Sequence, residues 1–141
     1  MALLEIRDLK KYFPVHNGPL RLDREHVKAI DGVSLDVEEG ETVGLVGESG
    51  CGKSSLGRCL VRLIEPSGGT VTFEGHELSA LSGSAMREMR RKMQMIFQDP
   101  YASLNPRMRV GDIIGEGLRI HGLAKGRDLK QRVLELLKKV G

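Results

Sequence analysis

The chain has 141 residues, of which 40% are hydrophobic and 29% charged, a composition typical of a folded globular protein and not of a disordered or fibrous one. Lys and Arg outnumber Asp and Glu by only 22 to 19, so the charge balance gives no support to a nucleic-acid partner. Every stretch without charged residues is far shorter than the roughly 20 apolar residues that span a bilayer, and the two cysteines indicate neither a disulfide framework nor a zinc site.

The first third of the chain predicts strands. Hydrophobic and polar residues alternate over residues 3–13 and again over 33–37, which is the period of a half-buried strand. Two prolines and a glycine between them, in residues 14–21, predict a surface loop. The continuous apolar run at 42–46 is typical of a strand buried on both faces of a parallel sheet. We expect this run to be the central strand.

The rest of the chain predicts mostly helices. Apolar residues recur at helical spacing from Leu56 to Ile64, and Pro66 would end that helix. A short strand at 71–73 and a helix capped by Ser82 or Ser84 follow. The apolar run at 93–97 predicts a second buried strand, and two helices are expected at 110–120 and 129–140.

The segment between the expected central strand and the first helix carries the chemistry. Gly47-Glu48-Ser49-Gly50-Cys51-Gly52-Lys53-Ser54 matches the pattern GxxxxGK[ST], in the strand–loop–helix context that this phosphate-binding loop requires. Glycines let successive backbone N–H groups turn inward around a phosphate, and the following helix adds its positive end to the same anion. The sequence therefore predicts a nucleotide phosphate site.

The residues of this loop have distinct expected roles. Lys53 would place its charge on the β- and γ-phosphates, the hydroxyl of Ser54 is a hard oxygen ligand suited to Mg²⁺, and Ser55 is placed to reach the α-phosphate. Cys51 is interpreted as a small filler, because nothing in the sequence around it supplies a base to activate a thiolate. The predicted binding residues are Gly47, Glu48, Ser49, Gly50, Cys51, Gly52, Lys53, Ser54 and Ser55.

Segments on both sides of the loop give the chain a family resemblance. Leu9-Lys10-Lys11-Tyr12-Phe13-Pro14-Val15, the phosphate loop, and the segment from Met93-Gln94-Met95-Ile96-Phe97-Gln98-Asp99-Pro100 to Arg107 together resemble the N-terminal part of an ABC-transporter ATP-binding subunit of the oligopeptide/dipeptide permease branch. The resemblance covers the whole chain. It implies an incomplete α/β P-loop NTPase fold of the ABC type: an antiparallel β subdomain and the start of a RecA-like core in residues 1–98, and the start of the helical subdomain in 99–141.

The resemblance also implies further site residues, with ATP and Mg²⁺ as the bound groups. Gln98 occupies the position of the family's Q-loop, so it is expected to reach Mg²⁺ and the attacking water, which makes Lys53 and Gln98 the predicted catalytic residues and Ser54 and Gln98 the predicted metal ligands. The aromatic residue at the end of the first strand stacks on adenine in this family. Phe13 fits the spacing better than Tyr12, and either of them could instead simply pack under the sheet.

The partners implied by the resemblance are transmembrane permease subunits and a second ATP-binding subunit, with Tyr101 to Leu104 as the surface that would meet the permease. The expected location is cytoplasmic, peripheral to the inner face of the plasma membrane, and no export signal is visible at the N-terminus. The basic residues of the helix after Ser84 could suggest a nucleic-acid patch, but they lack interleaved aromatic residues and are better explained as a solvated helix face.

Several elements that hydrolysis needs do not occur in the sequence. Family members carry an apolar strand ending in Asp-Glu and an LSGGQ signature after the Q-loop, and neither follows Gln98 here. Leu81-Ser82-Gly83 resembles the start of the signature but precedes Gln98. We therefore expect the chain to belong to an ATPase that energises uptake of peptides or a related solute and to be inactive alone. The alternatives are a truncated module that only binds nucleotide, or a soluble ABC ATPase without a transport role.

Overall fold

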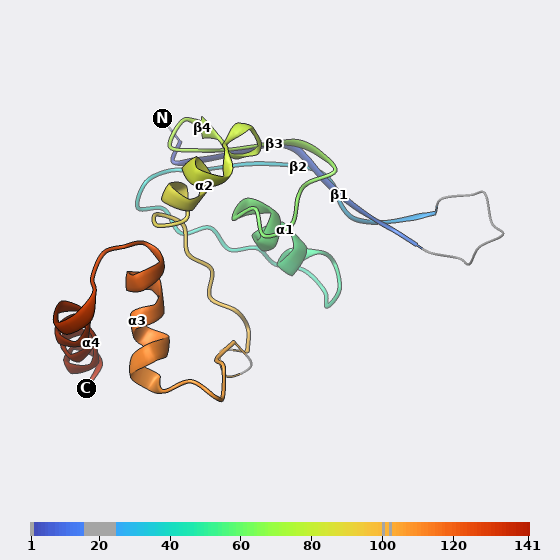
Figure 1. Ribbon diagram of the computed structural model, residues 1–141. Helices are drawn as coiled ribbons and strands as arrows, with labels where there is room; N and C mark the ends of the chain where they lie inside the picture. Colours follow the sequence, from blue (N-terminus) through green and yellow to red (C-terminus); the bar gives the residue numbers. More distant parts are fainter. Residues whose placement is uncertain (1, 16–24, 100, 102) are drawn as a thin grey trace. The chain divides into compact units, whose positions relative to one another are not determined.

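The computed structural model describes residues 2–15, 25–99, 101 and 103–141. The chain divides into two compact units, Met1–Met95 and Ile96–Gly141. The first contains the sheet and the glycine loop, and the second contains two helices (Figure 1). Each unit is described by itself below.

A four-stranded antiparallel sheet forms the frame of the first unit. Its strands β1 (Leu4–Pro14), β2 (His26–Val37), β3 (Gly68–Phe73) and β4 (His76–Glu77) lie in the order β2-β1-β3-β4. The long strands β1 and β2 run side by side (Figure 1), as the alternating sequence pattern predicts. The loop expected at 14–21 lies, apart from its first two positions, outside the described residues.

The core of the first unit lies between this sheet and two short helices. Helix α1 (Lys53–Leu60) buries Leu56 and Cys59, and α2 (Gly83–Met89) buries Met86 and Met89. Ser82 caps α2, because its hydroxyl accepts a hydrogen bond from the backbone N–H of Ala85. The segment Leu81-Ser82-Gly83 therefore serves as a helix cap. The core residues are Ile6, Leu9, Ile30, Leu56, Cys59, Val71, Phe73, Leu78, Met86 and Met89.

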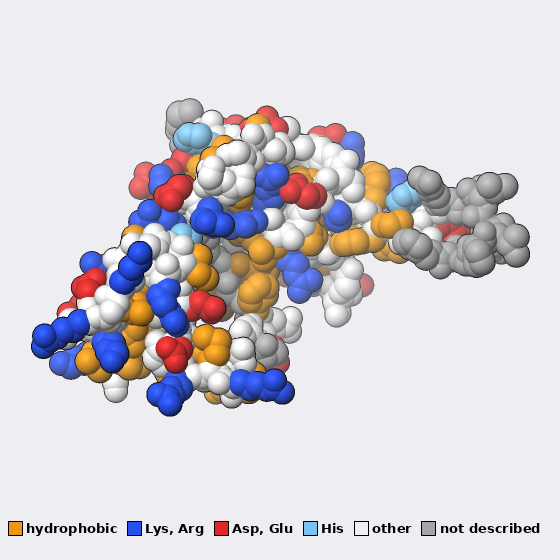
Figure 2. All heavy atoms as spheres, in the orientation of Figure 1, with side chains coloured by type: hydrophobic (Ala, Val, Ile, Leu, Met, Phe, Trp, Pro, Cys, Tyr) orange, Lys and Arg blue, Asp and Glu red, His pale blue; other side chains and the backbone are white. Residues whose placement is uncertain are grey.

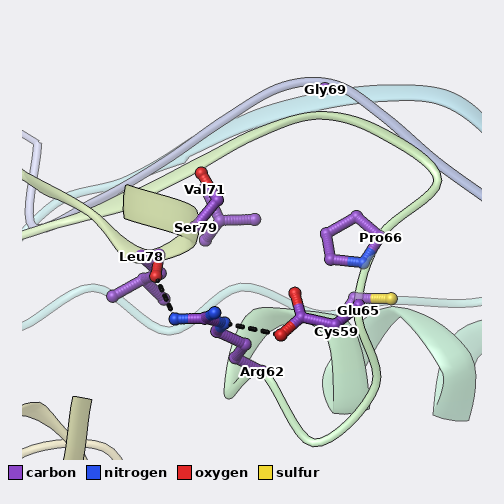
Figure 3. Close-up of a pocket in the computed structure, with 8 residues that line it drawn as sticks. All are labelled: Cys59, Arg62, Glu65, Pro66, Gly69, Val71, Leu78 and Ser79. Atoms are coloured by element: carbon purple, nitrogen blue, oxygen red, sulfur yellow. Dashed lines mark hydrogen bonds and ion pairs between the residues drawn. The ribbon is translucent and has the colours of Figure 1, made fainter. Parts of the chain in front are cut away.

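Helix α1 is shorter than its apolar pattern predicts. It ends at Leu60 because Arg62 adopts a left-handed conformation, with φ of +51°. The Arg62 guanidinium donates a hydrogen bond to the carbonyl of Leu78 and pairs with Glu65 at 2.8 Å (Figure 3). It also donates a hydrogen bond to the carbonyl of Leu81. Leu78 begins the 3₁₀ helix η1 (Leu78–Ala80). The helix end is therefore set by a tertiary contact that the local sequence does not reveal.

A small cavity lies beside Arg62, between α1 and β3 (Figure 3). Its volume is about 10 Å³, which is room for about one water molecule. Because an organic ligand needs a much larger space, this cavity is not a candidate binding site.

The two strands predicted to be fully buried are absent from the structure, so both predictions were wrong. Residues 42–46 and 93–97 have irregular backbone, and Val46 and Ile96 are 93% and 87% exposed. A strand in a parallel sheet needs a neighbouring strand to receive its backbone hydrogen bonds. Within the described residues, neither segment has such a neighbour. Both segments are apolar, as the sequence shows, but apolar composition alone does not provide the neighbouring strand that a buried strand needs.

The second unit is a pair of helices, as predicted. Helix α3 (Val110–Ile120) packs against α4 (Gly126–Val140), and Gly115 of α3 meets Leu129 and Val133 of α4. A methyl group on Gly115 would lie 3.3 Å from Leu129, so a small residue is needed at this crossing. Lys and Arg dominate the charged side chains that these helices present in Figure 2.

Candidate functional site

The predicted phosphate loop leads directly into α1, and its geometry depends on glycine at two positions. Gly52, the residue before the helix, has φ of +99°, and Gly50 has φ of +84°. A Cβ atom on Gly52 would lie 2.1 Å from the carbonyl oxygen of Ala29 in β2, a distance that real Cβ atoms essentially never show. Gly52 therefore seats the N-terminus of α1 against the sheet, and no larger residue fits there.

Ala29 is a component of this site that the sequence did not identify. Across β1 and β2, Lys11 pairs with Ile30 and Tyr12 pairs with Lys28, which leaves Ala29 as an extra residue in β2. This irregularity lies where Gly52 approaches the strand. Because the contact is made by a backbone carbonyl, no side-chain pattern in the sequence could have indicated it.

The start of the loop is closed by Cys51. A Cβ atom on Gly47 would lie 2.7 Å from the Cys51 sulfur, so the thiol folds back over the first glycine. The backbone N–H of Cys51 donates to the carbonyl of Glu48 at 3.3 Å, which closes a turn. Cys51 is exposed, whereas Cys59 in the same unit is buried. These contacts give Cys51 a packing role in the loop.

Lys53 points back across the loop. Its Nζ donates hydrogen bonds to the carbonyl oxygens of Gly47, at 2.7 Å, and Glu48, at 2.6 Å, and lies 3.5 Å from the Cys51 sulfur. The ammonium group is therefore held against the start of the loop by neutral acceptors, which do not compensate its charge. A compact cation fixed beside a glycine loop is a group that attracts phosphate.

The helix that follows the loop adds to this positive field. The first turn of α1 contains no acidic residue, so nothing in that turn opposes the positive end of the helix dipole. Ser54 and Ser55 are in this turn, Ser54 exposed and Ser55 half-buried. A hydroxyl at each position can accept or donate one hydrogen bond, or supply an oxygen to a hard cation. The loop and the helix start thus fit a phosphate group with an associated Mg²⁺.

Gln98 belongs to the other compact unit. It is exposed and lies in a bend after the irregular segment at 93–97. The phosphate loop belongs to the first unit, so an approach of Gln98 to Ser54 stays a prediction.

The two candidate aromatic residues lie on opposite faces of β1. The side chain of Lys11, two positions before Phe13, reaches the carbonyl of Glu65 just beyond α1, and residues two apart in a strand share a face. Phe13 is therefore on the α1 side of the sheet, and its side chain is 38% exposed.

Tyr12 is engaged on the other face. Its hydroxyl donates a hydrogen bond to Asp31, which raises the pKa of Tyr12 and lowers the pKa of Asp31. Lys28 lies over the Tyr12 ring at 5.5 Å and pairs with Asp31 at 3.1 Å. Of the two aromatic residues, Phe13 is the one that faces the side of the sheet where the phosphate loop leads into α1.

Three basic residues of the turn after α2 make contacts within the first unit. Arg90 donates to the carbonyl of Arg62, Arg91 pairs with Glu88, and Lys92 pairs with Glu74. These contacts tie the helix to its surroundings and fit the interpretation of a solvated helix face.

Comparison with known proteins places this site in a family. The model of a family described as ABC transporter matches residues 30–141, which include the phosphate loop and Gln98. The chain belongs to the ABC transporter family. The expected resemblance and the expected fold, a fragment of an ABC-type P-loop domain, are therefore confirmed.

Relatives within the family include ATP-binding proteins of oligopeptide transport and of glutathione import. The chain is 55% identical to the oligopeptide transport ATP-binding protein OppF and 47% identical to AppF, described in the same words, both of Bacillus subtilis. It is 48% identical to the glutathione import ATP-binding protein GsiA of Escherichia coli. Each match covers 99% of this chain but only 44%, 43% and 22% of the relative, respectively. The chain thus spans less than half the length of these relatives.

Solved ABC cassettes share the fold. A dimeric bacterial ABC transporter cassette is 26% identical to this chain with a TM-score of 0.77, and the same cassette in a post-hydrolysis state, bound to ADP and Pi, gives 25% and 0.76. Both cover 96% of this chain and 56% of the cassette. Among the residues that the structure describes, none of the helices combines the length and hydropathy needed to cross a bilayer.

Proposed function

We propose that the chain binds the phosphates of ATP at the loop 47–55, as the nucleotide-binding part of an ABC ATPase subunit that energises uptake of peptides or a related solute. The observation that carries this proposal is the position of Lys53, whose ammonium group is held by the carbonyls of Gly47 and Glu48 at the start of a glycine loop. The likeness to ATP-binding proteins of oligopeptide transport and of glutathione import supports the solute class.

The residues of the loop have different proposed roles in nucleotide binding. Backbone N–H groups of the loop and the first turn of α1 surround the phosphates, and Lys53 neutralises the charge on the β- and γ-phosphates. Ser54 would supply an oxygen to Mg²⁺ and Ser55 a hydrogen bond to the α-phosphate. When bound, Mg²⁺ supplies electrostatic neutralisation of the phosphate oxygens. Gln98 is proposed as the further ligand that also orients the attacking water.

Phe13 is the proposed platform for adenine. It lies on the α1 side of β1, and the Ala29 carbonyl that meets Gly52 is on the neighbouring strand. At the usual strand spacing and rise, Phe13 is about 8 Å from that contact. A nucleotide whose phosphates occupy the loop can therefore extend its base along β1 to the ring. Tyr12, turned to the other face, is better explained by its contacts with Asp31 and Lys28.

The proposed partners are permease subunits of the membrane and a second ATP-binding subunit, at the cytoplasmic face of the plasma membrane. Tyr101 and Leu104, 85% and 48% exposed, are the proposed contact with the permease. The water-orienting Asp-Glu pair and the signature motif of the family do not occur in these 141 residues. We therefore expect the chain by itself to bind ATP without turning it over.

The test is calorimetric titration of the 141-residue chain with ATP and Mg²⁺, comparing Lys53→Ala with the native sequence. Loss of a charged hydrogen-bond donor facing the phosphates should weaken binding by at least tenfold. Lys130→Ala, an exposed lysine of α4, is the matched control and should leave the affinity unchanged. An unchanged affinity in Lys53→Ala would refute the site. Phosphate release at enzymatic rates by the native chain would refute the expectation that it only binds.

A further inference from the structure

Lys11 makes two contacts that connect the proposed base platform to the phosphate-loop helix. Its Nζ donates a hydrogen bond of 2.8 Å to the carbonyl oxygen of Glu65. The same Nζ lies over the ring of Phe13, 5.0 Å from the ring centroid. Glu65 comes shortly after α1, the helix that begins at the phosphate loop. One side chain therefore links the strand that carries Phe13 to the chain leaving that helix.

The position of Lys11 is also supported by its effect on Cys59. Burial raises the pKa of the Cys59 thiol, and the charge of Lys11 acts in the opposite direction. Cys59 is a buried residue of α1, so the Lys11 ammonium group lies on the helix side of the sheet. Phe13 lies on the same side, because the Lys11 Nζ is 5.0 Å from its ring centroid.

Lys11 differs from the lysine of the other cation–aromatic pair in having no carboxylate partner among the described residues. Lys28 lies over Tyr12, but its charge is paired with the carboxylate of Asp31. Lys11 forms no ion pair within the described part of the chain, and its acceptor is a neutral carbonyl. A full positive charge thus faces the Phe13 ring, the arrangement that makes a cation–π contact effective.

We propose that Lys11 is a positioning residue for base recognition in this chain. It covers one face of the Phe13 ring and holds the ring in place, so that only the opposite face is open to a nucleobase. The inference rests on the proposed function, in which Phe13 stacks on adenine. A cation on one face of a ring also draws electron density from the other face, which favours stacking of an electron-rich purine there.

The expected effect is confined to the base. Lys11→Met keeps an unbranched apolar stem but removes the charge and the donor, so ATP affinity should fall about two- to fivefold. Affinity for inorganic tripolyphosphate should not change, because that ligand has no base to stack. Lys11→Arg keeps the charge and a donor and should bind ATP like the native chain. Lys10→Met is the matched control, because Lys10 pairs with Asp8 at 2.7 Å.

The experiment is calorimetric titration of the full 141-residue chain and these variants with ATP and with tripolyphosphate, both with Mg²⁺. Binding of tripolyphosphate by each variant shows that its phosphate loop is folded. The same titrations in a Phe13→Leu background form a double-mutant cycle, in which Lys11→Met should have no further effect on ATP binding.

Five results would overturn the proposal. An equal loss for ATP and tripolyphosphate would mean that Lys11 acts through the fold of the loop. Unchanged ATP affinity in Lys11→Met, or a loss of the same size in the Phe13→Leu background, would mean that Lys11 does not act through the ring. If the native chain binds tripolyphosphate but binds ATP no more tightly, the base platform is wrong while the phosphate site stands. Failure to bind either ligand would refute the proposed function and this inference with it.

Discussion

Replacement of Gly52 by alanine tests how the phosphate loop is held against the sheet. The left-handed backbone at φ of +99° costs an L-residue about 1–2 kcal/mol. The new Cβ would also lie 2.1 Å from the Ala29 carbonyl oxygen, and such overpacking costs about 1–3 kcal/mol more. We therefore expect Gly52→Ala to lower the free energy of unfolding by about 2–5 kcal/mol, the sum of these two costs.

Substitutions at two other glycines separate the backbone cost from the overpacking cost. Gly50 has φ of +84° but open space where a methyl group would lie, so Gly50→Ala should cost only the backbone contribution of about 1–2 kcal/mol. Gly83 lies in α2 with open space and no positive φ, so Gly83→Ala should stabilise the chain by up to about 1 kcal/mol. The difference between the Gly52 and Gly50 variants measures the contact with Ala29.

The assay is urea unfolding, monitored by far-ultraviolet circular dichroism. The dependence of the free energy of unfolding on urea concentration is compared between variants. The expected order of stability, from highest to lowest, is Gly83→Ala, native, Gly50→Ala and Gly52→Ala. If Gly52→Ala is no less stable than Gly50→Ala, the close approach to Ala29 does not exist in solution. In that case β2 would not position the start of α1.

Three further predictions concern the first unit. Iodoacetamide should alkylate Cys51 in the native chain but Cys59 only in urea, because Cys59 is 1% exposed and burial raises its pKa; peptide mass mapping would show this. The hydrogen bond from Arg7 lowers the pKa of Asp36 in the folded chain. The pair therefore stabilises the fold above the usual carboxyl pKa, and this stabilisation is lost as the pH falls through the lowered pKa of Asp36. Asp36→Asn should therefore flatten the fall of the urea midpoint below about pH 4. Arg62→Met should cost about 1–3 kcal/mol in urea unfolding, because two backbone carbonyls near η1 lose their donor.

Each of these predictions has an outcome that contradicts it. Equal alkylation of the two thiols in the native chain would mean that α1 does not bury Cys59. An acid-induced fall that is just as steep in Asp36→Asn would mean that the pair with Arg7 does not link β1 to β2 in solution. An Arg62→Met variant as stable as the native chain would mean that something other than these hydrogen bonds ends α1.

Local sequence patterns were sufficient for the elements that are completed by nearby residues. The alternation in β1, the cap at Ser82 and the apolar stripes of α3 and α4 all correspond to elements of the structure. The segments 42–46 and 93–97 were not predictable in this way. A buried strand depends on a neighbouring strand to pair with, and the local sequence pattern does not show whether one is present. The end of α1 at Leu60 likewise depends on the distant carbonyls that Arg62 reaches.

The family could be recognised from the order of the residues alone, and the same order predicts the phosphate loop. Glycine spacing and a following Lys-Ser are chemical requirements of phosphate binding, so they are visible in the sequence. The folded chain was needed to show which aromatic residue shares the side of α1, and that Lys11 covers it, because both depend on the register of β1 against β2 and β3. It was also needed to show that Gly52 rests on the backbone of Ala29. A contact with a backbone carbonyl leaves no trace in side-chain identity, so only three-dimensional packing reveals it.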